Sequence, residues 1–491
     1  MIPRRDHPED VLVIGSGIGG LTTAIILLKL GCRVTVVEKN PLPGGLMRSY
    51  RRDGIDCPVG VHYLGALAEG QPLKRMFDYL GVAERIPLER MGSNGVIDRY
   101  IFDDFTFDLP EGIDAFAENL HRSFRGEGSR IEVVIRNLRD ISARMNDLET
   151  LLPQPRDFEA LMAYMEPLGG LMTRLQCSPP LRRALGIMSS WIGIPPDECP
   201  VYYHHMALAS YLLSSWRPAC SGADMADAFA ARVTGLGGVI VSGDPVARIL
   251  VRGGAVQGAA LESGRTLPAG RVVVAIHPRT LLGMLPGEAV KPVYRKRLSR
   301  LEDTQGIFSA YFTVGADANP ELPYNIFRIF TEDEGAMPAG FFYQRRKTGR
   351  PGLNLVSLMT SSPAAEWERW EHTRTGKRGA DYREAKERKA EGLIREAERI
   401  FGPHRGLKLL DASTNLTLRD WVGTPGGSAY GVLRSTRQWI GAAMLNRTSV
   451  AGLHLAGQNV LASGVFGTVL GSFYTVRQMI GRERFLKEVV L

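Results

Sequence analysis

Four residues near the N-terminus have the types and the spacing of a nucleotide-binding turn. Gly15, Gly17 and Gly20 follow the apolar run 11–14, and Glu38 ends a second apolar run 18 residues after Gly20. In such a unit the first glycine permits a tight turn, the second lets a pyrophosphate approach the backbone, and the third lets a helix pack closely on the sheet. The acid accepts both ribose hydroxyls and disfavours a 2′-phosphate. This pattern predicts that the chain binds an adenosine diphosphate moiety.

A strand, a helix and a second strand must position these residues. The helix is predicted over the apolar run 21–30, ends at Gly31, and leads into a strand at 33–38. The N-terminus of such a helix carries unpaired N–H groups and about half a unit of positive charge, which suits a phosphate. Because all of these signals fall in register, a dinucleotide site is favoured over an ordinary βαβ unit.

Later segments are predicted to complete the same sheet. Alternating, β-branched runs at 237–241, 246–251, 255–261 and 271–276 predict strands that return to the first sheet and form a small hairpin layer. A third piece, 453–459 with the glycines that follow it, predicts a strand, a glycine-rich turn and a helix that closes the sheet.

The expected fold class is therefore α/β, with a discontinuous Rossmann-like nucleotide-binding domain and an α+β substrate domain. Amphipathic patterns over 131–151 and 381–401 predict helices in the second domain. The segment 158–220 is rich in Leu, Met, Tyr and Trp, and it is predicted to form either a helical core or a part that lines the substrate site and contacts a membrane. The domains are assigned as 1–72, 228–285 and 408–491 for the nucleotide, and 73–227 and 286–407 for the substrate.

Composition narrows the protein class. With 44% hydrophobic and 23% charged residues over 491 positions, the chain is typical of a globular protein. Its five cysteines form no CxxC pair and no histidines cluster with them, so neither disulfides nor a metal site is expected. No run of 18 apolar residues predicts a transmembrane helix, and the early nucleotide motif leaves no room for a signal peptide. We expect a cytoplasmic protein.

The net charge of +8 is carried partly by basic clusters at 294–300 and 345–350. Such clusters are ordinarily solvated faces, and they also attract anionic lipid by about 1 kcal/mol per basic residue near a membrane. No aromatic-interleaved basic motif accompanies them in the sequence, so nucleic acid is not an expected partner.

Segments beyond the first βαβ unit carry a family resemblance. Residues 39–50 and 54–65 resemble the phytoene desaturase superfamily, which belongs with the amine oxidase-like flavoproteins. Within it, 59–65 is similar to the retinol saturase and carotenoid isomerase branch, and 423–431 and 455–467 are similar to retinol saturases. The resemblance covers about half of the chain, and the substrate segments add nothing specific to it.

The resemblance implies FAD as the cofactor and assigns its contacts. Its ADP half would be held by Gly15, Gly17, Gly20 and Glu38, its diphosphate region by Gly44 and Gly45, its adenine by the backbone of Val246, and its pyrophosphate, ribityl and flavin by Gly457, Asn459 and Val465. The same motifs place Gly19, Lys39, Leu46, Arg48, His62, Gly464 and Phe466 against the cofactor.

Two positions depart from the pattern of the wider superfamily. Leu46 directly follows the Gly-Gly pair where many relatives have Arg or Lys, and Arg48 is the nearest base. Asn459 stands where many relatives have an acid, and its amide can still form a hydrogen bond with a ribityl hydroxyl or a phosphate.

Three side chains are candidates for moving a proton. His62 lies in a motif expected near the flavin, and a pKa close to the working pH would let it donate the proton that saturation of a double bond requires. The competing interpretation is a histidine satisfied by backbone and packing in a tight turn. Tyr63 and Tyr430 are further proton-donor candidates. His204 and His205 are adjacent, so on a helix they would not share a face, and they predict no metal site.

The function that the resemblance implies is FAD-dependent chemistry on the C=C bonds of a long, hydrophobic, conjugated lipid similar to a retinoid or a carotenoid. Hydride transfer with flavin N5 would give saturation or desaturation. The alternative is a redox-neutral cis-trans isomerase of a carotenoid-like polyene that uses reduced FAD. More distant alternatives are an amine oxidase and a non-enzymatic carrier of prenyl lipids.

The partners follow from the same chemistry. Gly235-Leu-Gly-Gly238 has the wrong spacing and flanks for a second dinucleotide motif, so the electron partner is expected to be a quinone, oxygen or transiently bound NAD(P)H. A twenty-carbon chain favours lipid over water by on the order of 10 kcal/mol. We therefore expect an apolar tunnel that opens on a membrane-contacting face, with the basic clusters and exposed Trp, Leu or Met side chains making a peripheral membrane attachment.

Overall fold

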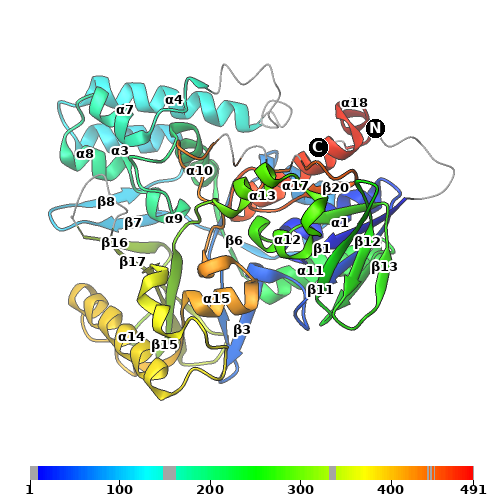
Figure 1. Ribbon diagram of the computed structural model, residues 1–491. Helices are drawn as coiled ribbons and strands as arrows, with labels where there is room; N and C mark the ends of the chain where they lie inside the picture. The colour runs from blue at the N-terminus through cyan, green and yellow to red at the C-terminus, as the bar shows by residue number, and fades with distance from the viewer. Residues whose placement is uncertain are drawn as a thin grey trace.

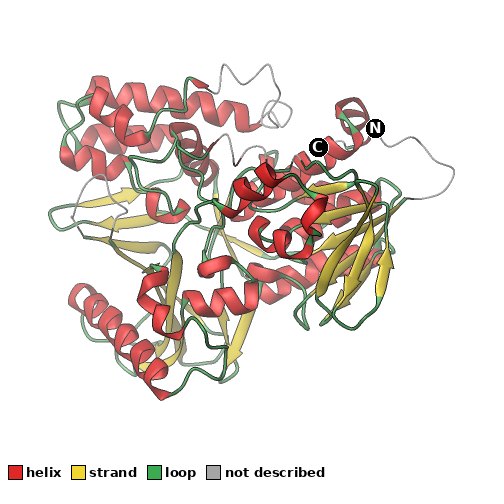
Figure 2. Cartoon of the chain, viewed as in Figure 1, coloured by secondary structure: helices red, strands yellow, loops and turns green. Residues whose placement is uncertain are grey.

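The computed structural model describes residues 9–146, 162–219, 221–330, 339–439, 442, 445–446 and 448–489. Cys220 and the last residues of the helix predicted over 131–151 lie outside these ranges, as do parts of the predicted domain segments. Figure 1 shows the nucleotide-binding sheet and its helices at the right, a second sheet at the lower left, and a group of helices above that second sheet. Figure 2 shows the same division by secondary structure.

The nucleotide-binding sheet has five parallel strands in the order β10-β2-β1-β14-β20. Residues 11–14 of its central strand are all buried, so both faces of the sheet are covered and the strand is apolar throughout. The strands come from three separate stretches of the chain, which confirms the predicted discontinuous Rossmann-like fold. They are β1 (Asp10–Ile14), β2 (Arg33–Glu38), β10 (Val239–Ser242), β14 (Arg271–Val274) and β20 (Leu453–Leu455).

Three helices accompany this sheet, and α1 (Ile18–Lys29) contacts both α11 (Gly222–Gly235) and α17 (Gly464–Ile480). Gly31 follows α1 with φ +82°, in the left-handed conformation typical of a helix C-terminus. Because α11 is one helix packed on α1, the predicted domain boundary at 228 is corrected to its start at 222. The expected hairpin layer is a separate antiparallel sheet of β11 (Val246–Arg252), β12 (Ala255–Leu261) and β13 (Thr266–Pro268).

The second sheet has seven strands in the order β19-β15-β18-β17-β16-β7-β8. Among the described strands of this sheet, only β16 and β7 pair in parallel. The assignment of 408–491 to the nucleotide domain is wrong at its start, because residues 408–413 form β19 and pair antiparallel with β15. The strands are β7 (Asp98–Ile101), β8 (Thr106–Leu109), β15 (Gly306–Gly315), β16 (Asn325–Ile329), β17 (Gly340–Lys347), β18 (Leu353–Ser362) and β19 (Lys408–Ser413).

Helices surround the second sheet and the junction between the sheets. The helices predicted over 131–151 and 381–401 are present as α4 and α14. Their bounds, with those of the other helices, are α2 (Pro72–Leu80), α3 (Ile113–Ser123), α4 (Gly128–Asn146), α7 (Leu168–Arg174), α8 (Pro179–Leu185), α9 (Ser189–Ile192), α10 (Val201–Leu213), α12 (Pro278–Met284), α13 (Pro292–Ser299), α14 (Ala380–Phe401), α15 (Asn415–Val422) and α18 (Arg482–Glu488). The short strands are β3 (Ser49–Arg52), β4 (Ile55–Pro58), β5 (Leu64–Gly65), β6 (Leu88–Arg90) and β9 (Ser215–Pro218).

The apolar stretch 206–216 is divided between two elements. α10 is largely buried and ends at Leu213, Ser214 is extended, and the chain continues as β9. The prediction of a helical core for the segment 158–220 therefore holds for α10. Within the described ranges, none of the helices is both long enough and apolar enough to span a bilayer.

Candidate active site

Three glycine-rich loops meet at the N-terminus of α1. Gly17 and Gly44 form an isolated parallel β-bridge, and a Cβ atom on Gly45 would lie 3.1 Å from the Cα of Gly17. A Cβ atom on Gly19 would overlap the Cα of Gly457. The turn after β1, the loop after β2 and the turn after β20 therefore close around one point.

The glycines of the first turn differ in the space around them. Gly15 has φ +95°, where glycine is favoured, and a Cβ atom on Gly20 would overlap the carbonyl oxygen of Gly15. A Cβ atom on Gly17 would meet no protein atom within 4 Å. Gly17 is the N-cap of α1 and supplies no side-chain cap, so the first N–H groups of the helix lack an intrahelical acceptor. A pyrophosphate fits this arrangement, and the residues present thus suit FAD.

Glu38 is fixed at the end of β2. Its side chain is buried, and its Oε2 accepts hydrogen bonds from both the backbone N–H, at 3.0 Å, and the hydroxyl of Ser16. Its Oε1 accepts from the backbone N–H of Asn40 at 2.9 Å. A carboxylate offers about four lone-pair positions, so the carboxylate is held in place and retains capacity for a ribose hydroxyl.

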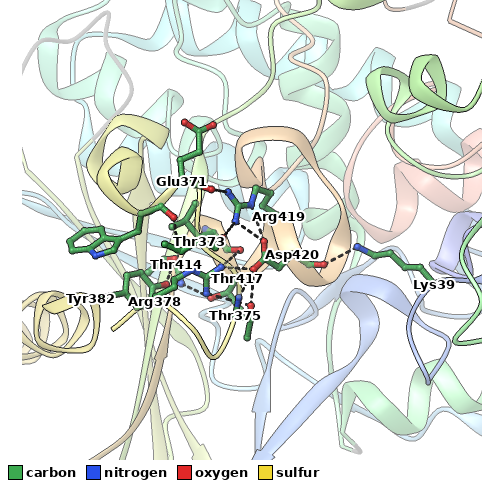
Figure 3. A network of polar contacts seen from close by, with 12 residues as sticks. Lys39, Glu371, Thr373, Thr375, Arg378, Tyr382, Thr414, Thr417, Arg419 and Asp420 are labelled. Atoms are coloured by element: carbon green, nitrogen blue, oxygen red, sulfur yellow. Dashed lines mark hydrogen bonds and ion pairs between the residues drawn. The ribbon is translucent and has the colours of Figure 1, made fainter. Parts of the chain in front are cut away.

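Lys39 joins the end of β2 to α15. Its Nζ donates to the carbonyl oxygen of Asp420 at 2.8 Å. Figure 3 shows the network behind this contact, in which the Asp420 carboxylate accepts from Thr375 and Arg378 and pairs with Arg419. Burial acts to raise the pKa of Asp420, but the hydrogen bonds from Arg419 and Thr375 outweigh it and lower the pKa. Lys39 therefore ties the loop that follows Glu38 to α15, which the network holds in place.

Leu46 and Arg48 flank the Gly-Gly loop. Leu46 is half-buried in a 3-10 turn over Gly45–Met47. Arg48 Nη1 donates to the carbonyl of Pro43 at 2.7 Å and pairs with Asp227 of α11 at 3.0 Å. The charged end of Arg48 thus braces the loop against α11. Val246, the predicted adenine contact, is buried at the start of β11.

Asn459 fastens the C-terminal motif to the loop that carries Tyr430. The Oδ1 of Asn459 accepts from the backbone N–H of Val432 at 2.9 Å. A Cβ atom on Gly431 would overlap the same Oδ1, so only glycine allows the two loops to approach this closely. The amide that replaces the acid of many relatives is therefore used, in this chain, to position a neighbouring backbone.

The N-terminus of α17 is open. Gly464 has φ +74°, and a Cβ atom there would meet no atom within 4 Å. The N-cap residue Ser463 supplies no side-chain cap, and its backbone N–H donates to the hydroxyl of Tyr203 at 3.1 Å. Val465 and Phe466 follow in the first turn and are half-buried. This end of α17 is thus available to a ligand, as the glycine-rich motif predicts.

An aromatic pocket lies between the second sheet, α9 and the Tyr430 loop. Aromatic and aliphatic side chains form most of its wall, with few polar groups, as is typical of small-molecule sites. The described residues that line it are Trp191, Gly193, Gln305, Gly306, Ile307, Phe327, Arg328, Ile329, Ala339, Gly340, Phe341, Phe342, Met359, Thr360, Ser361 and Tyr430.

His62 lies beside this pocket, with its ring centroid 5.5 Å from that of Phe342. It is buried, and neither ring nitrogen has a hydrogen-bond partner among the described residues. Burial, with a smaller contribution from Arg346, lowers the pKa of His62 to about 4. The expectation of a pKa near working pH is therefore wrong, because desolvation disfavours the imidazolium. Backbone hydrogen bonds do not satisfy the ring either, which leaves both nitrogens able to meet a cofactor.

Tyr63 points into a buried polar network. Its hydroxyl donates to Asp98 Oδ2 at 2.8 Å, and Asn325 Nδ2 donates to the other carboxylate oxygen at 2.9 Å. Burial raises the pKa of Asp98 to about 6, against the opposing hydrogen bonds from Tyr63 and Asn325. Sequence reasoning missed Asp98, since no motif marks a single acid in β7. Tyr430, in contrast, lines the pocket itself, and burial raises its pKa.

The fold and the site together define an FAD-dependent oxidoreductase. The family model for flavin containing amine oxidoreductases matches residues 18–475, and the chain belongs to this family.

Individual proteins also resemble this chain over most of its length. The chain is 22% identical to all-trans-retinol 13,14-reductase of Danio rerio over 98% of this chain and 88% of that protein. It is 23% identical to prolycopene isomerase 2 of an Oncidium hybrid cultivar over 92% and 80%. An oxidoreductase from Methanosarcina mazei shares the fold, with a TM-score of 0.67 and 17% identity over 95% of this chain and all of that one. The resemblance to the retinol saturase and carotenoid isomerase branch is thereby confirmed.

Proposed function

We propose that the protein reduces a C=C bond of a long, conjugated, retinoid- or carotenoid-like lipid. The observation that carries this proposal is the aromatic pocket beside Tyr430 and Phe342, whose wall is suited to an apolar polyene. The likeness to a retinol reductase supports saturation, and the likeness to a prolycopene isomerase keeps isomerisation as the second candidate. FAD, once reduced, supplies a hydride, and the protein must orient the lipid and deliver a proton.

We infer the cofactor contacts from the open positions described above. The pyrophosphate would meet the backbone at Gly17 and the N-terminus of α1, and the ribose would meet Glu38. The flavin would lie at the open end of α17 around Gly464, within reach of the unpaired nitrogens of His62. Lys39 and Arg48 then act by holding the surrounding loops, since their charged groups bond to protein atoms.

Tyr430 is the better placed proton donor. It lines the pocket and, with a raised pKa, carries its proton at every working pH. His62, with a pKa of about 4, is almost entirely neutral at pH 7 and therefore cannot act there as an imidazolium acid. The Tyr63 hydroxyl is committed to Asp98.

Tyr430→Phe should slow formation of the saturated product by about 10²- to 10⁴-fold, the usual contribution of a positioned acid. The spectrum of bound FAD should not change. The measurement is single-turnover flavin reoxidation under anaerobic conditions, with Tyr63→Phe and His62→Gln as matched variants. A large loss in Tyr63→Phe or His62→Gln, with Tyr430→Phe unaffected, would move the donor to that residue.

The function itself is tested by reducing the purified protein without oxygen and adding polyenes such as retinol and a cis-carotenoid. Flavin reoxidation together with a product two hydrogens heavier would establish a saturase. Flavin that stays reduced while the polyene spectrum shifts at constant mass would establish the isomerase. If neither changes with any polyene, while a primary amine reduces the oxidised flavin, the proposal fails in favour of amine oxidation.

We propose a peripheral membrane contact at α13. Lys291, Lys296 and Arg300 are exposed there, and Val293 is 71% exposed. The basic cluster at 345–350 is a weaker candidate, because several of its arginines bond to backbone carbonyls elsewhere in the protein. The other exposed large apolar side chains among the described residues come from separate segments of the chain.

Lys296→Glu should weaken binding to phosphatidylserine vesicles by roughly tenfold, since each basic residue near an anionic surface contributes about 1 kcal/mol and reversal removes more than one such contribution. Co-sedimentation with phosphatidylserine and with phosphatidylcholine vesicles measures this. Lys347→Glu makes the same charge change in the other cluster and serves as the control. Equal losses in the two variants would show that only net charge matters and that α13 is not the contact.

A further inference from the structure

Arg434 is a buried cation for which the described residues supply no counter-ion. The residue is 3% exposed, and its Nε and Nη2 have no hydrogen-bond partner among the described residues. Burial lowers the pKa of Arg434 to about 10, which still leaves the guanidinium protonated at neutral pH. An unpaired buried charge is strongly unfavourable, and buried arginines are ordinarily paired with an anion or a hydrogen-bond acceptor. The guanidinium therefore marks a place where a ligand supplies the missing acceptor.

Tyr203 connects this cation to the N-terminus of α17. Burial raises the pKa of Tyr203 and the charge of Arg434 acts against this rise, which makes the two side chains neighbours. The Tyr203 hydroxyl bonds to both the backbone N–H and the hydroxyl of Ser463. The next residue, Gly464, begins the helix and has open space where a Cβ atom would be. A helix N-terminus carries a partial positive charge, so two sources of positive potential converge on one region.

We propose that Arg434 and the N-terminus of α17 together bind the pyrimidine carbonyl edge of FAD and stabilise the negative charge of the reduced flavin. A flavin that accepts a hydride places its extra charge on N1 and the C2 carbonyl, which are planar acceptors matched to a guanidinium. The inference rests on the flavin and is independent of which lipid the protein reduces.

The apolar pocket argues against a lipid head group as the partner of Arg434. Arg328 is the basic residue among the described residues that line the pocket, so an acidic head group inside it would meet Arg328. Arg434 instead follows the Tyr430 loop, whose backbone is fastened to Asn459 of the C-terminal flavin motif. The placement of Arg434 therefore favours the cofactor.

Sulfite provides a test that needs no substrate. Its lone pair adds to N5 of the oxidised flavin, the visible flavin absorbance is lost, and the added negative charge resides on N1 and the C2 carbonyl. FAD-loaded Arg434→Gln should bind sulfite roughly 10- to 100-fold more weakly than the wild-type protein, the range for losing one hydrogen bond to a charged group. Its flavin reduction potential should also become more negative. Arg434→Lys should retain most of the affinity.

The matched control is Arg130→Gln. Arg130 is a half-buried arginine on α4, and its Nε donates to the carbonyl of Leu175. Its sulfite affinity should equal that of the wild type. Should Arg434→Gln fail to fold, Arg434→His gives the same test, since its sulfite affinity relative to wild type should fall as pH rises and the imidazole loses its charge. Wild-type sulfite affinity and potential in FAD-loaded Arg434→Gln, or no such relative pH dependence in Arg434→His, would overturn the proposal.

Discussion

Gly17→Ala should give a folded protein that has lost most of its affinity for FAD. Gly17 has φ −62° and ψ 173°, a conformation that alanine adopts freely, and its Cβ atom would meet no protein atom within 4 Å. The added methyl group would instead occupy the space that we assign to the pyrophosphate. The expected result is a colourless protein with a wild-type circular dichroism spectrum and a weakened FAD titration. A yellow variant with wild-type affinity would show that the pyrophosphate does not approach Gly17.

Gly20→Ala, in contrast, should impair folding itself rather than FAD binding. Its Cβ atom would overlap the carbonyl oxygen of Gly15 and lie 3.3 Å from the Cβ of Ala275, so α1 would have to move away from the sheet. Overpacking of this kind costs about 1–3 kcal/mol even where side chains can adjust, and here a backbone atom is the obstacle. We expect insoluble protein or a large fall in the denaturation midpoint, without FAD as well as with it.

Gly392→Ala separates this effect from glycine substitution in general. Gly392 lies inside α14, and a Cβ atom there would meet nothing within 4 Å. Alanine in a helix interior is favoured over glycine by about 1 kcal/mol, so this variant should be slightly more stable. Urea denaturation of the three variants, with and without FAD, measures the contrast. Equal behaviour of Gly17→Ala and Gly20→Ala would remove the distinction between a binding glycine and a packing glycine.

The nucleotide half of the fold could be predicted from the sequence because its signals are local. Gly20 must be a glycine because a Cβ atom there would overlap the carbonyl oxygen of Gly15, five residues earlier. Glu38 acts from the last position of its own strand, so the spacing of the residues is enough to locate both. The position of β19 could not be found in this way. Its pairing with β15 joins residues about a hundred positions apart, and its sequence carries no mark of which sheet it enters.

The same difference between local and long-range signals applies to the candidate site. Motifs located the glycines and Tyr430, but they could not give the environment of a side chain. His62 appears in a motif, yet its lowered pKa results from burial near Phe342, which comes from a distant strand of the second sheet. Neither Asp98 nor Arg434 lies in a motif. Only the fold buries Asp98 between the hydrogen-bond donors Tyr63 and Asn325, and only the fold leaves two nitrogens of Arg434 without a partner among the described residues.

Acid should unfold the protein well above the pKa of an ordinary carboxyl group, because several histidines are buried in the neutral form. Burial lowers the pKa of His62 and His205 to about 4, from 6.5. Burial also lowers the pKa of His204, with a further contribution from His205, whose Nδ1 lies 3.2 Å from its own. A group with a lowered folded pKa contributes stability above its unfolded pKa, and that stability is lost as pH falls toward the folded value.

The expected loss of unfolding free energy on acidification can be estimated from these pKa shifts. At pH 5 His62 and His205 each cost about 2 kcal/mol relative to pH 7, at 1.36 kcal/mol per pH unit below 6.5, and His204 adds to this in the same direction. Asp98 acts oppositely, because its pKa is raised from 3.8 to about 6 and its protonation between these values favours the fold by about 1 kcal/mol at pH 5. The net loss of at least about 3 kcal/mol is a large share of a typical unfolding free energy of about 5–15 kcal/mol.

The measurement is the urea midpoint of the FAD-loaded protein from pH 7.5 to pH 4.5. It should fall steeply below about pH 6.5, and His204→Gln/His205→Gln should flatten the slope by about 1.4 kcal/mol per pH unit for each histidine removed. His121→Gln is the control for a histidine substitution at the surface, where the side chain keeps its contact with water. A midpoint that stays constant down to pH 5 would mean that these imidazoles gain protons without unfolding the chain, and that their burial is relieved by local opening.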